Sequence, residues 1–380
     1  MSKIDILYVI TKLELGGAQK QLLELIRNLD KEKYRVHLFT AKKALLIKEA
    51  ESIKDLALIK SRYLERTINP FKDTLAFIEL YFFIRKNRFQ IVHTHSSKAG
   101  ILGRLAAKVA GVKNIIHTVH GWSFHRYQNK IIYRLFLYLE RMTALFTTKI
   151  IVVSNYDREK GLEYKIGTPD KYVLINYGID YSEFKRKPNL ELKDQLRINR
   201  ASPVIGMIAC FKPQKGIFDF VKVAQRVSFS FPEVRFILVG DGVLRAKIEK
   251  FIQKLNLEKR IILLGWRRDI PNILSIIDVF VLTSLWEGMP ISVLEAKVSE
   301  KPVVVTDTGG VSEIIKDSID GFLVPCGNID LISEKILILL KDKELRESMG
   351  KKAWVSLNHK FSLISMMKEI EHLYSQIIKS

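Results

Sequence analysis

The sequence predicts an α/β protein made of two doubly wound domains, and three observations lead to this fold class. Short runs rich in Val, Ile and Phe alternate with longer amphipathic segments, as strands and helices do in parallel sheets covered by helices. The alternation stops in a polar stretch at residues 182–202 and restarts at residue 204. With 380 residues the chain can bury two separate cores.

The order strand, loop, helix, strand, loop, helix is clearest in residues 277–313. Ile277–Thr283 is an apolar run typical of a buried strand, and Pro290 stands where a helix can begin, because the first helical N–H needs no partner. Lys301–Pro302 ends this helix, and Val303–Thr306 is the next strand. We therefore expect both loops at the carboxyl ends of strands, the edge at which open α/β sheets bind ligands.

Two carboxylates lie in this stretch. Glu287 is in the first loop, and Glu295 follows about two helical turns later, so both can face one crevice. Helix N-termini suit phosphate, whereas carboxylates accept hydrogen bonds from hydroxyl groups. A sugar nucleotide has hydroxyls on both sides of its phosphates and fits both features. The alternative is that Glu287 caps the helix and Glu295 is solvated, and two glutamates alone favour this structural role.

The whole stretch of residues 277–313 indicates a function more specifically than its two glutamates do. Its ordered set is Ser284, Glu287-Gly288-Met289-Pro290, Glu295-Ala296, Pro302-Val303-Val304, Gly309-Gly310 and Glu313. This set resembles the Glu-x7-Glu signature region of the retaining glycosyltransferases of family 4. The resemblance covers nearly the whole chain and implies the GT-B fold, in which two Rossmann-like domains face a cleft.

The resemblance also implies roles for these residues. The second domain should hold the sugar nucleotide and the first domain the acceptor. Glu287, with Gly288 and Met289 ahead of Pro290, would hold the donor sugar, and Glu295 would accept the ribose hydroxyls. The family retains the anomeric configuration. No Asp-x-Asp occurs in the chain, which agrees with a metal-independent reaction, so no metal-binding residue and no cofactor besides the donor is expected.

The first half begins with a buried strand at Ile4–Ile10, a loop with Gly16 and Gly17, and an amphipathic helix at Gln19–Leu29. Adjacent glycines let the backbone approach a ligand closely, and a tight strand-to-helix turn explains them equally well. The loop resembles the family's Gly-Gly-Ala-Glu loop, with Gln19 where Glu is usual. This likeness implies that Gly16 and Gly17 lie near the donor diphosphate.

The alternation continues through the first half, although residues 41–66 give no clear pattern. Further strands are expected at Tyr34–Thr40, Ile91–His95, Asn114–Val119, Ile150–Val153 and Tyr172–Ile175, and helices at residues 69–86 and 98–110. Four histidines fall on two adjacent strand ends: His93, His95, His117 and His120. Metal binding is one interpretation, but alternation along a strand turns two of them into the sheet.

Residues 92–125 closely resemble family members that build bacterial capsule and other surface polysaccharides. In the family, a histidine at the position of His120 contacts the donor sugar near the reacting carbon. The resemblance therefore makes His120 and Glu287 the catalytic candidates. It implies a nucleotide donor, most commonly a UDP-sugar, and an undecaprenyl-diphosphate-linked saccharide as acceptor.

The charge of the chain is unevenly distributed. The formal net charge is +21, and residues 1–190 contain 34 Lys and Arg against 18 Asp and Glu. We expect the basic half to meet an anionic partner such as lipid headgroups, a lipid diphosphate or nucleic acid, although a generally Lys-rich proteome is an alternative. No helix-turn-helix, zinc or single-strand-binding signature accompanies the charge, so nucleic acid is not the expected partner.

Residues 125–149 mix basic and aromatic side chains. The set is Arg126, Lys130, Arg134, Arg141 and Lys149 with Tyr127, Tyr133, Phe136, Tyr138 and Phe146. A basic helix with aromatics suits a membrane surface, and a helix packed on the sheet with a solvated basic stripe is the alternative. Because the implied acceptors are lipid-linked, the membrane interpretation is preferred.

The predicted location is the cytoplasm, at the inner face of the cell membrane. Cys210 and Cys326 form neither a disulfide framework nor a metal-binding pattern, which fits a reducing compartment. No signal peptide is identified, and no apolar run reaches the length that spans a bilayer. Any membrane contact should therefore be peripheral.

The second half repeats the alternation of strands and helices after a linker at residues 182–202. Val204–Ala209 is a strand, and the loop Cys210–Gly216 reads CFKPQKG before the next helix. Lysines in a loop that opens a helix suit a diphosphate. The loop resembles the family's Arg-x4-Lys-Gly diphosphate loop and matches it at Lys215. Cys210 replaces the usual arginine, and Lys212 could supply its charge.

Two further loops also resemble segments of the family. Gly265 and Trp266 follow the strand Ile261–Leu264 and by resemblance lie near the nucleotide base. Residues 176–180, which end the first half, resemble the family's Asn-Gly-x-Asp turn with Tyr177 in place of Asn. The predicted domains are residues 1–185, residues 186–365, and a final helix at 366–380 that packs back on the first domain.

The sequence thus predicts a retaining, metal-independent glycosyltransferase of bacterial cell-surface polysaccharide synthesis. A sugar-nucleotide epimerase is an alternative with the same domain plan, and the Glu-x7-Glu context speaks against it. A catalytically silent glycan-binding relative is another alternative, because Cys210 and Tyr177 depart from the family pattern.

Overall fold

The computed structural model describes residues 3–184 and 187–379, which form two compact units. The N-terminal unit contains the chain up to Gly178 together with the last segment from Ile364 onward, and the C-terminal unit runs from Ile179 to Leu363. The predicted boundary between residues 185 and 186 lies outside the described residues. Each unit has its own sheet and its own core.

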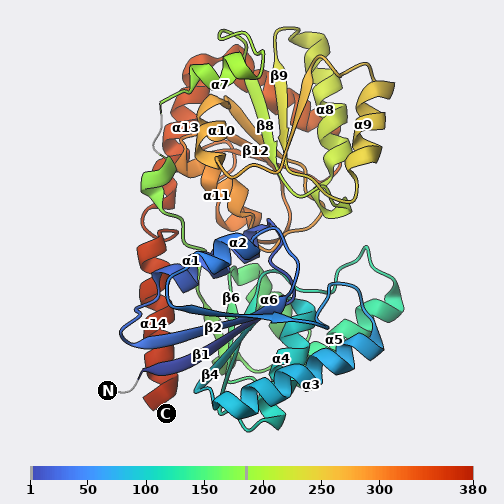
Figure 1. The fold of residues 1–380 in the computed structure, drawn as a ribbon. Coiled ribbons are helices and arrows are strands. Elements are labelled where there is room, and N and C mark those ends of the chain that lie inside the picture. The colour runs from blue at the N-terminus through green and yellow to red at the C-terminus, as the bar shows by residue number, and fades with distance from the viewer. Residues whose placement is uncertain (1–2, 185–186, 380) are drawn as a thin grey trace. The chain divides into compact units, whose positions relative to one another are not determined.

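The N-terminal unit is built on a parallel sheet of seven strands in the order β3-β2-β1-β4-β5-β6-β7 (Figure 1). The strands are β1 (Ile4–Ile10), β2 (Tyr34–Ala41), β3 (Leu56–Ser61), β4 (Ile91–His95), β5 (Asn114–Val119), β6 (Lys149–Val152) and β7 (Tyr172–Leu174). The order reverses between β1 and β4, which is the switch point of a doubly wound sheet. The central strands β1 and β4 are buried on both faces over most of their length, although β4 includes the polar residues His93, Thr94 and His95.

Helices cover both faces of this sheet. They are α1 (Gly17–Asn28), α2 (Ile47–Glu51), α3 (Pro70–Asn87), α4 (Ser97–Val109), α5 (Lys130–Ala144), α6 (Asn155–Glu163) and α14 (Leu363–Lys379). Right-handed crossovers put α1 and α2 on one face and α3 to α6 on the other. In Figure 1, α3, α4 and α5 lie together on one side of the strands, and α4 contacts both of its neighbours.

A buried polar chain fixes the last helix to the sheet of the N-terminal unit. The hydroxyl of Tyr374, on α14, lies 2.8 Å from the hydroxyl of Tyr8 on β1 and 2.7 Å from Nδ1 of His93 on β4. Tyr8, His93 and Tyr374 are all fully buried. Since buried polar groups need partners, these three residues place α14 in one position.

The C-terminal unit has a parallel sheet of six strands in the order β10-β9-β8-β11-β12-β13. The strands are β8 (Val204–Ile208), β9 (Arg235–Val239), β10 (Ile261–Gly265), β11 (Val279–Leu282), β12 (Val303–Thr306) and β13 (Phe322–Val324). Its switch point lies between β8 and β11, which pair directly. The carboxyl ends of these two strands therefore form the expected ligand edge.

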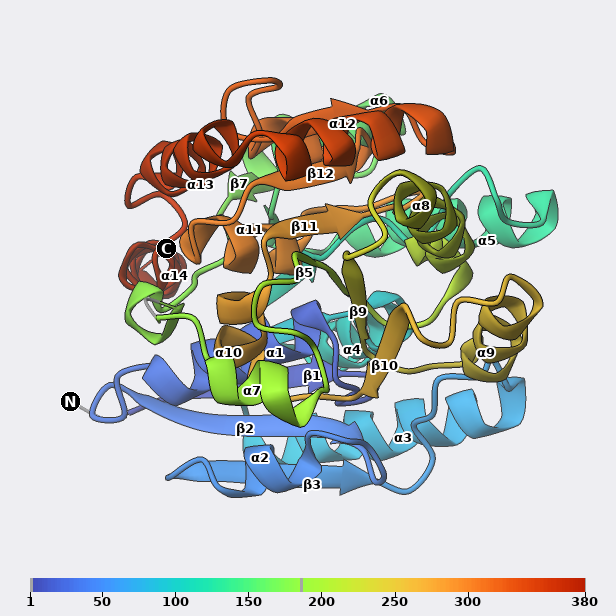
Figure 2. The same ribbon diagram turned by 90° about the horizontal axis from the view of Figure 1, so that it is seen from above.

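The helices of the C-terminal unit again lie on both faces. They are α7 (Leu190–Gln195), α8 (Ile217–Ser230), α9 (Arg245–Lys254), α10 (Ile270–Ile276), α11 (Ile291–Val298), α12 (Ile329–Lys341) and α13 (Lys343–Leu357). Figure 2 shows α8 and α9 on one side of the strands and α10 and α11 on the other. Short 3-10 helices occur at residues 169–171, 181–184, 213–215 and 309–313.

The predicted fold class is confirmed, and the structure adds to or differs from the sequence analysis in three places. Residues 41–66 form α2 and β3, which were missed because α2 has only five residues and β3 is an edge strand with only Ser61 buried. The predicted linker contains α7, whose N-cap is Asn189. The second helix expected in residues 277–313 is a short 3-10 helix at Gly309–Glu313.

Candidate functional site

The candidate site in the C-terminal unit starts at the carboxyl ends of β8 and β11. The loop after β8 contains Lys212 and Lys215, and the loop after β11 contains Glu287. Several hydrogen bonds join the two loops. The Leu285 N–H donates to the Gln214 carbonyl at 2.8 Å, the Gln214 side-chain amide donates to the Trp286 carbonyl at 2.9 Å, and the Thr283 hydroxyl donates to the Gly216 carbonyl at 2.9 Å.

Gly216 is required where these loops meet. Its φ is +57°, and a Cβ added there would lie 2.0 Å from the carbonyl oxygen of Thr283. Only glycine combines this left-handed backbone with so close an approach. Lys215, the preceding residue, is therefore held directly beside the loop after β11.

Three donors surround the Glu287 carboxylate. The Ser284 hydroxyl donates to Oε1 at 2.6 Å, the Lys215 ammonium pairs with the same oxygen, and the Gln214 amide lies 3.5 Å from Oε2. The side chain of Glu287 is only 6% exposed, whereas that of Lys215 is 19% exposed. A carboxylate that is buried needs such partners, and charge-assisted hydrogen bonds hold its orientation.

A third loop, after β12, supports the Glu287 loop from the other side. The Gly310 N–H donates to the Gly288 carbonyl at 2.8 Å. A Cβ on Gly309 would lie 1.9 Å from the Glu287 carbonyl oxygen. Met289 is buried and Pro290 caps α11, so the segment from Glu287 to α11 is fixed along its whole length.

The remaining predicted donor residues lie at the same edge of this sheet. Lys212 precedes the short 3-10 helix Pro213–Lys215, and Glu295 is half-buried on α11. Gly265 ends β10 with φ +63°, and the half-buried Trp266 follows it. Sequence reasoning did not single out Gln214, although its position next to Lys215 in the CFKPQKG loop was a signal.

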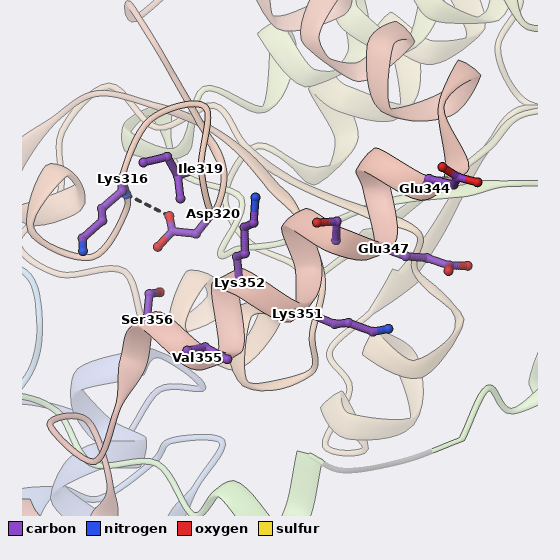
Figure 3. Close-up of a pocket in the computed structure, with 10 residues that line it drawn as sticks. Lys316, Ile319, Asp320, Glu344, Glu347, Lys351, Lys352, Val355 and Ser356 are labelled. Carbon is purple, nitrogen blue, oxygen red and sulfur yellow. Dashed lines mark hydrogen bonds between the residues drawn. The ribbon is translucent and has the colours of Figure 1, made fainter.

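A groove of about 590 Å³ elsewhere in this unit is not part of the site (Figure 3). It lies between α13 and the turn at residues 316–320, which precedes β13. This is the amino end of the strand, opposite the ligand edge. Asp320 is committed to structure there, because it accepts from the backbone N–H of Lys316 at 2.8 Å and from the buried Lys297 at 3.0 Å.

In the N-terminal unit, Gly16 and Gly17 begin α1. Gly16 is the N-cap, with extended backbone, and provides no side-chain cap. A Cβ on Gly16 would lie 2.7 Å from Oε1 of Gln19. The first N–H groups of α1 thus keep their capacity to bind an anion, as the resemblance implies.

The four histidines of the N-terminal unit separate into two roles. His93 contacts the Thr118 hydroxyl through Nε2 at 2.7 Å and Tyr374 through Nδ1, and His117 contacts the Thr94 hydroxyl at 2.9 Å. These rings are buried and bonded inside the sheet. His120 is half-buried beyond the end of β5, where it contacts His95 and Tyr177.

Burial keeps these rings neutral. Loss of solvation lowers the pKa of His93 to about 3 and that of His120 to about 4, and the neighbouring His120 adds to the effect at His93. The same cause places the pKa values of His95 and His117 well below the usual range. At neutral pH each ring therefore has one N–H donor and one acceptor nitrogen.

Two family models match the chain in sequence. Residues 15–183 match the model described as Glycosyltransferase Family 4, and residues 189–354 match Glycosyl transferases group 1. Over 382 aligned residues, 99% of this chain and 98% of the relative, the chain is 35% identical to the UDP-Gal:alpha-D-GlcNAc-diphosphoundecaprenol alpha-1,3-galactosyltransferase of Escherichia coli. The chain belongs to glycosyltransferase family 4.

A second relative of this glycosyltransferase has a related name. It is the N,N'-diacetylbacillosaminyl-diphospho-undecaprenol alpha-1,3-N-acetylgalactosaminyltransferase of Campylobacter jejuni, 28% identical over 87% of this chain and 89% of the relative. Among solved structures, Anabaena HepE in complex with UDP and glucose matches with a TM-score of 0.86 at 19% identity, covering 98% of this chain and 99% of HepE. The predicted GT-B fold is thereby confirmed.

Proposed function

We propose that this glycosyltransferase moves a sugar from a UDP-sugar to a saccharide carried on a lipid diphosphate, in the synthesis of bacterial cell-surface polysaccharide. The observation that supports this most is the 35% identity to the Escherichia coli galactosyltransferase along almost the entire length of both chains. That relative is named for a UDP-Gal donor and a GlcNAc-diphosphoundecaprenol acceptor. The Campylobacter relative is also named for a diphospho-undecaprenol acceptor.

The donor is proposed to bind at the ligand edge of the C-terminal unit. Lys215, assisted by Lys212, faces the diphosphate, and Glu287 accepts hydrogen bonds from the sugar hydroxyls. The adjacent positions of Lys215 and Glu287 support these roles, because a sugar nucleotide has a phosphate next to a hydroxyl-bearing ring. Glu295 accepts from the ribose hydroxyls, and Gly265 and Trp266 lie near the base.

The proposed reaction retains the anomeric configuration and needs neither a metal nor a cofactor besides the donor. As the bond to the diphosphate breaks, negative charge develops on the leaving group and positive charge on the sugar ring. Lys215 and the N–H groups at the start of α8 stabilise the leaving diphosphate. His120, a neutral donor, contacts the donor sugar near the reacting carbon.

A membrane surface is the proposed location of the acceptor, at the inner face of the cell membrane. No helix in residues 3–184 and 187–379 is long and apolar enough to span a bilayer. On α5 only Glu140, Thr143 and Ala144 are buried. Large apolar side chains on and around this helix are exposed: Tyr127, Ile131, Ile132, Leu135, Tyr138, Met142 and Leu145.

Basic residues accompany this exposed apolar surface. Arg126, Lys130, Arg134 and Arg141 are exposed on or beside α5. Exposed apolar side chains next to cations fit an anionic lipid surface, into which the apolar groups insert while the cations meet headgroups. A basic partner would be repelled by the same residues.

The deciding experiment measures transfer directly. Purified protein is incubated with UDP-galactose, UDP-glucose or UDP-N-acetylglucosamine and a synthetic GlcNAc-diphospholipid, with and without EDTA. We expect UDP release and a new disaccharide lipid with one donor, unaffected by EDTA, whose proton spectrum shows the donor's anomeric configuration retained. Conversion of the sugar nucleotide without acceptor would indicate an epimerase instead. Absence of turnover, with glycan binding intact, would support a silent relative.

A further inference from the structure

Tyr177 stands where the family's Asn-Gly-x-Asp turn has an asparagine, and it lies directly beside the catalytic candidate His120. It follows β7 and is buried, and its hydroxyl lies 2.8 Å from Nδ1 of His120. The planes of the two rings differ by only 18°, with centroids 5.7 Å apart. The 2.8 Å separation of the phenol oxygen and the ring nitrogen is a normal hydrogen-bond distance.

His95 meets the other nitrogen of the same ring. Its Nδ1 lies 3.0 Å from Nε2 of His120, and the two rings are inclined by 25°. His95 ends β4, His120 follows β5 and Tyr177 follows β7, so one edge of the sheet supplies all three residues. Both nitrogens of His120 are therefore engaged, and its ring is held in one orientation.

The direction of the two hydrogen bonds determines the tautomer of His120. The ring is neutral, since burial lowers its pKa to about 4, and so it has a single N–H. A phenol O–H is a more acidic donor than a neutral imidazole N–H, and the stronger arrangement has Tyr177 donating to Nδ1. The proton of His120 then lies on Nε2 and is donated to Nδ1 of His95.

His95 can accept this bond without losing another. Its own proton must then lie on its Nε2, which is buried and has no hydrogen-bond partner within residues 3–184 and 187–379. That tautomer leaves the Nε2–H of His95 without an acceptor among these residues, a cost that the stronger donation from Tyr177 to His120 has to outweigh. A ligand hydroxyl that replaced His95 as the acceptor would exchange one hydrogen bond of the Nε2–H group for another of similar strength.

We propose that Tyr177 is a positioning residue that keeps His120 in the Nε2–H form, ready to donate to a hydroxyl of the donor sugar. This inference rests on the proposed function. The inference explains the departure from the family pattern at residue 177, because the Tyr177 hydroxyl donates to Nδ1 of His120 and His120 in turn donates to the substrate.

The test compares Tyr177→Phe with Tyr172→Phe. Both variants remove one hydroxyl from a buried tyrosine, and Tyr172 donates to the Ile166 carbonyl at 2.6 Å without contacting His120. Long-range proton–nitrogen spectra of protein labelled with ¹⁵N-histidine report which ring nitrogen is protonated. His120→Gln identifies the His120 signals by their disappearance. Steady-state kinetics with the preferred UDP-sugar provide the second readout.

We expect the Nε2–H form of His120 in the wild type and in Tyr172→Phe, and a mixture of tautomers in Tyr177→Phe. The kcat of Tyr177→Phe should fall about tenfold, the effect of losing one hydrogen bond, with an unchanged KM for the donor. A Tyr177→Phe variant whose His120 stays in the Nε2–H form and whose kcat is unchanged would overturn the proposal.

Two results separate this inference from the proposed function. The spectra need no substrate, so a wild type that transfers no sugar would refute the proposed function while the tautomers still report on Tyr177. If Tyr177→Phe does not fold, the wild-type spectrum decides alone, because an Nδ1–H form of His120 contradicts the proposal.

Discussion

Lys215 and Glu287 form an ion pair that joins the loop after β8 to the loop after β11. A cation and a carboxylate in direct contact at one sheet edge restrict what can bind beside both of them. In the proposed donor site, a ligand with an anionic group next to hydroxyl groups would meet both partners, because the two are adjacent.

Replacement of Glu287 by glutamine should separate these two functions. The amide keeps the shape of the side chain but loses the charge that attracts Lys215 and accepts strongly from sugar hydroxyls. We expect kcat to fall roughly 100-fold, as when one strong charge-assisted contact in a transition state is lost. The dissociation constant of UDP, measured by calorimetry, should change less than threefold.

Lys215→Met is the matched comparison for this experiment. It should weaken UDP binding as well as turnover, because the ammonium is assigned to the diphosphate. If Glu287→Gln lost UDP affinity and turnover to the same extent, the assignment of Glu287 to the donor sugar would be wrong.

A second prediction concerns the backbone beneath Glu287. Gly309→Ala combines a left-handed φ of +62° with a Cβ that would lie 1.9 Å from the Glu287 carbonyl oxygen. Gly327→Ala has a similar φ of +78° with no atom within 4 Å of the added Cβ. Denaturant unfolding should show a loss of about 1 kcal/mol for Gly327→Ala and a larger loss for Gly309→Ala.

Activity distinguishes the two glycine variants further. Gly309→Ala must move the loop that carries Glu287, so its kcat should fall at least tenfold, whereas Gly327→Ala should keep wild-type kcat at a temperature where both are folded. Equal kcat values would show that the close approach at Gly309 has no effect on the site.

Charge reversal tests the proposed membrane surface. Changing Arg126, Lys130 and Arg134 together to Glu should abolish sedimentation with vesicles that contain phosphatidylglycerol. Each basic residue near an anionic surface contributes about 1 kcal/mol, so losing three weakens binding more than 100-fold. The control changes Lys247, Lys250 and Lys254, which are exposed on α9, and should sediment as the wild type does. Unchanged sedimentation of the α5 variant would refute this surface.

The buried histidines predict how stability depends on pH. In the folded chain the pKa of His93 is lowered to about 3 and that of His117 lies well below the usual value, chiefly because burial removes solvation. Below about pH 6.5 only the unfolded chain takes up these protons. The free energy of unfolding should therefore be highest above pH 6.5 and decrease as the pH falls, by about 1.4 kcal/mol per pH unit for each such ring.

Urea unfolding between pH 8 and pH 5 measures this slope. In His93→Gln the slope should be shallower than in the wild type by roughly the contribution of one ring, ~1.4 kcal/mol per pH unit. A His93→Gln slope equal to that of the wild type would contradict the prediction.

Most of the fold could be predicted because continuous apolar runs identify buried parallel strands. Ile4–Ile10 and Val303–Thr306 match the observed β1 and β12 residue for residue. The failures share a physical cause: the edge strand β3 and the short helices α2 and α7 bury few side chains, so their residues follow no strict period. The boundary of β11 was misplaced because Ile277 caps a helix, α10, that is as apolar as the strand.

Members of the candidate site could be predicted from the sequence only where the type of residue itself suggests a chemical role. Glu287 and Lys215 could be named from the sequence, but their pairing could not, since 72 residues separate them and the contact depends on β8 lying beside β11. Gln214 was missed for the same reason. His120 was identified by resemblance, whereas its partners His95 and Tyr177 are set by three strand ends that meet only in the folded sheet.

The position of Tyr374 has a consequence for how the chain is made. The first 178 residues leave the ribosome early, yet the helix that satisfies Tyr8 and His93 is synthesised after the whole C-terminal unit. The C-terminal unit can complete its fold while the N-terminal unit still exposes an unpaired polar core. A chain that stops short of residue 374 would therefore leave the core of the half that was translated first without its polar partner.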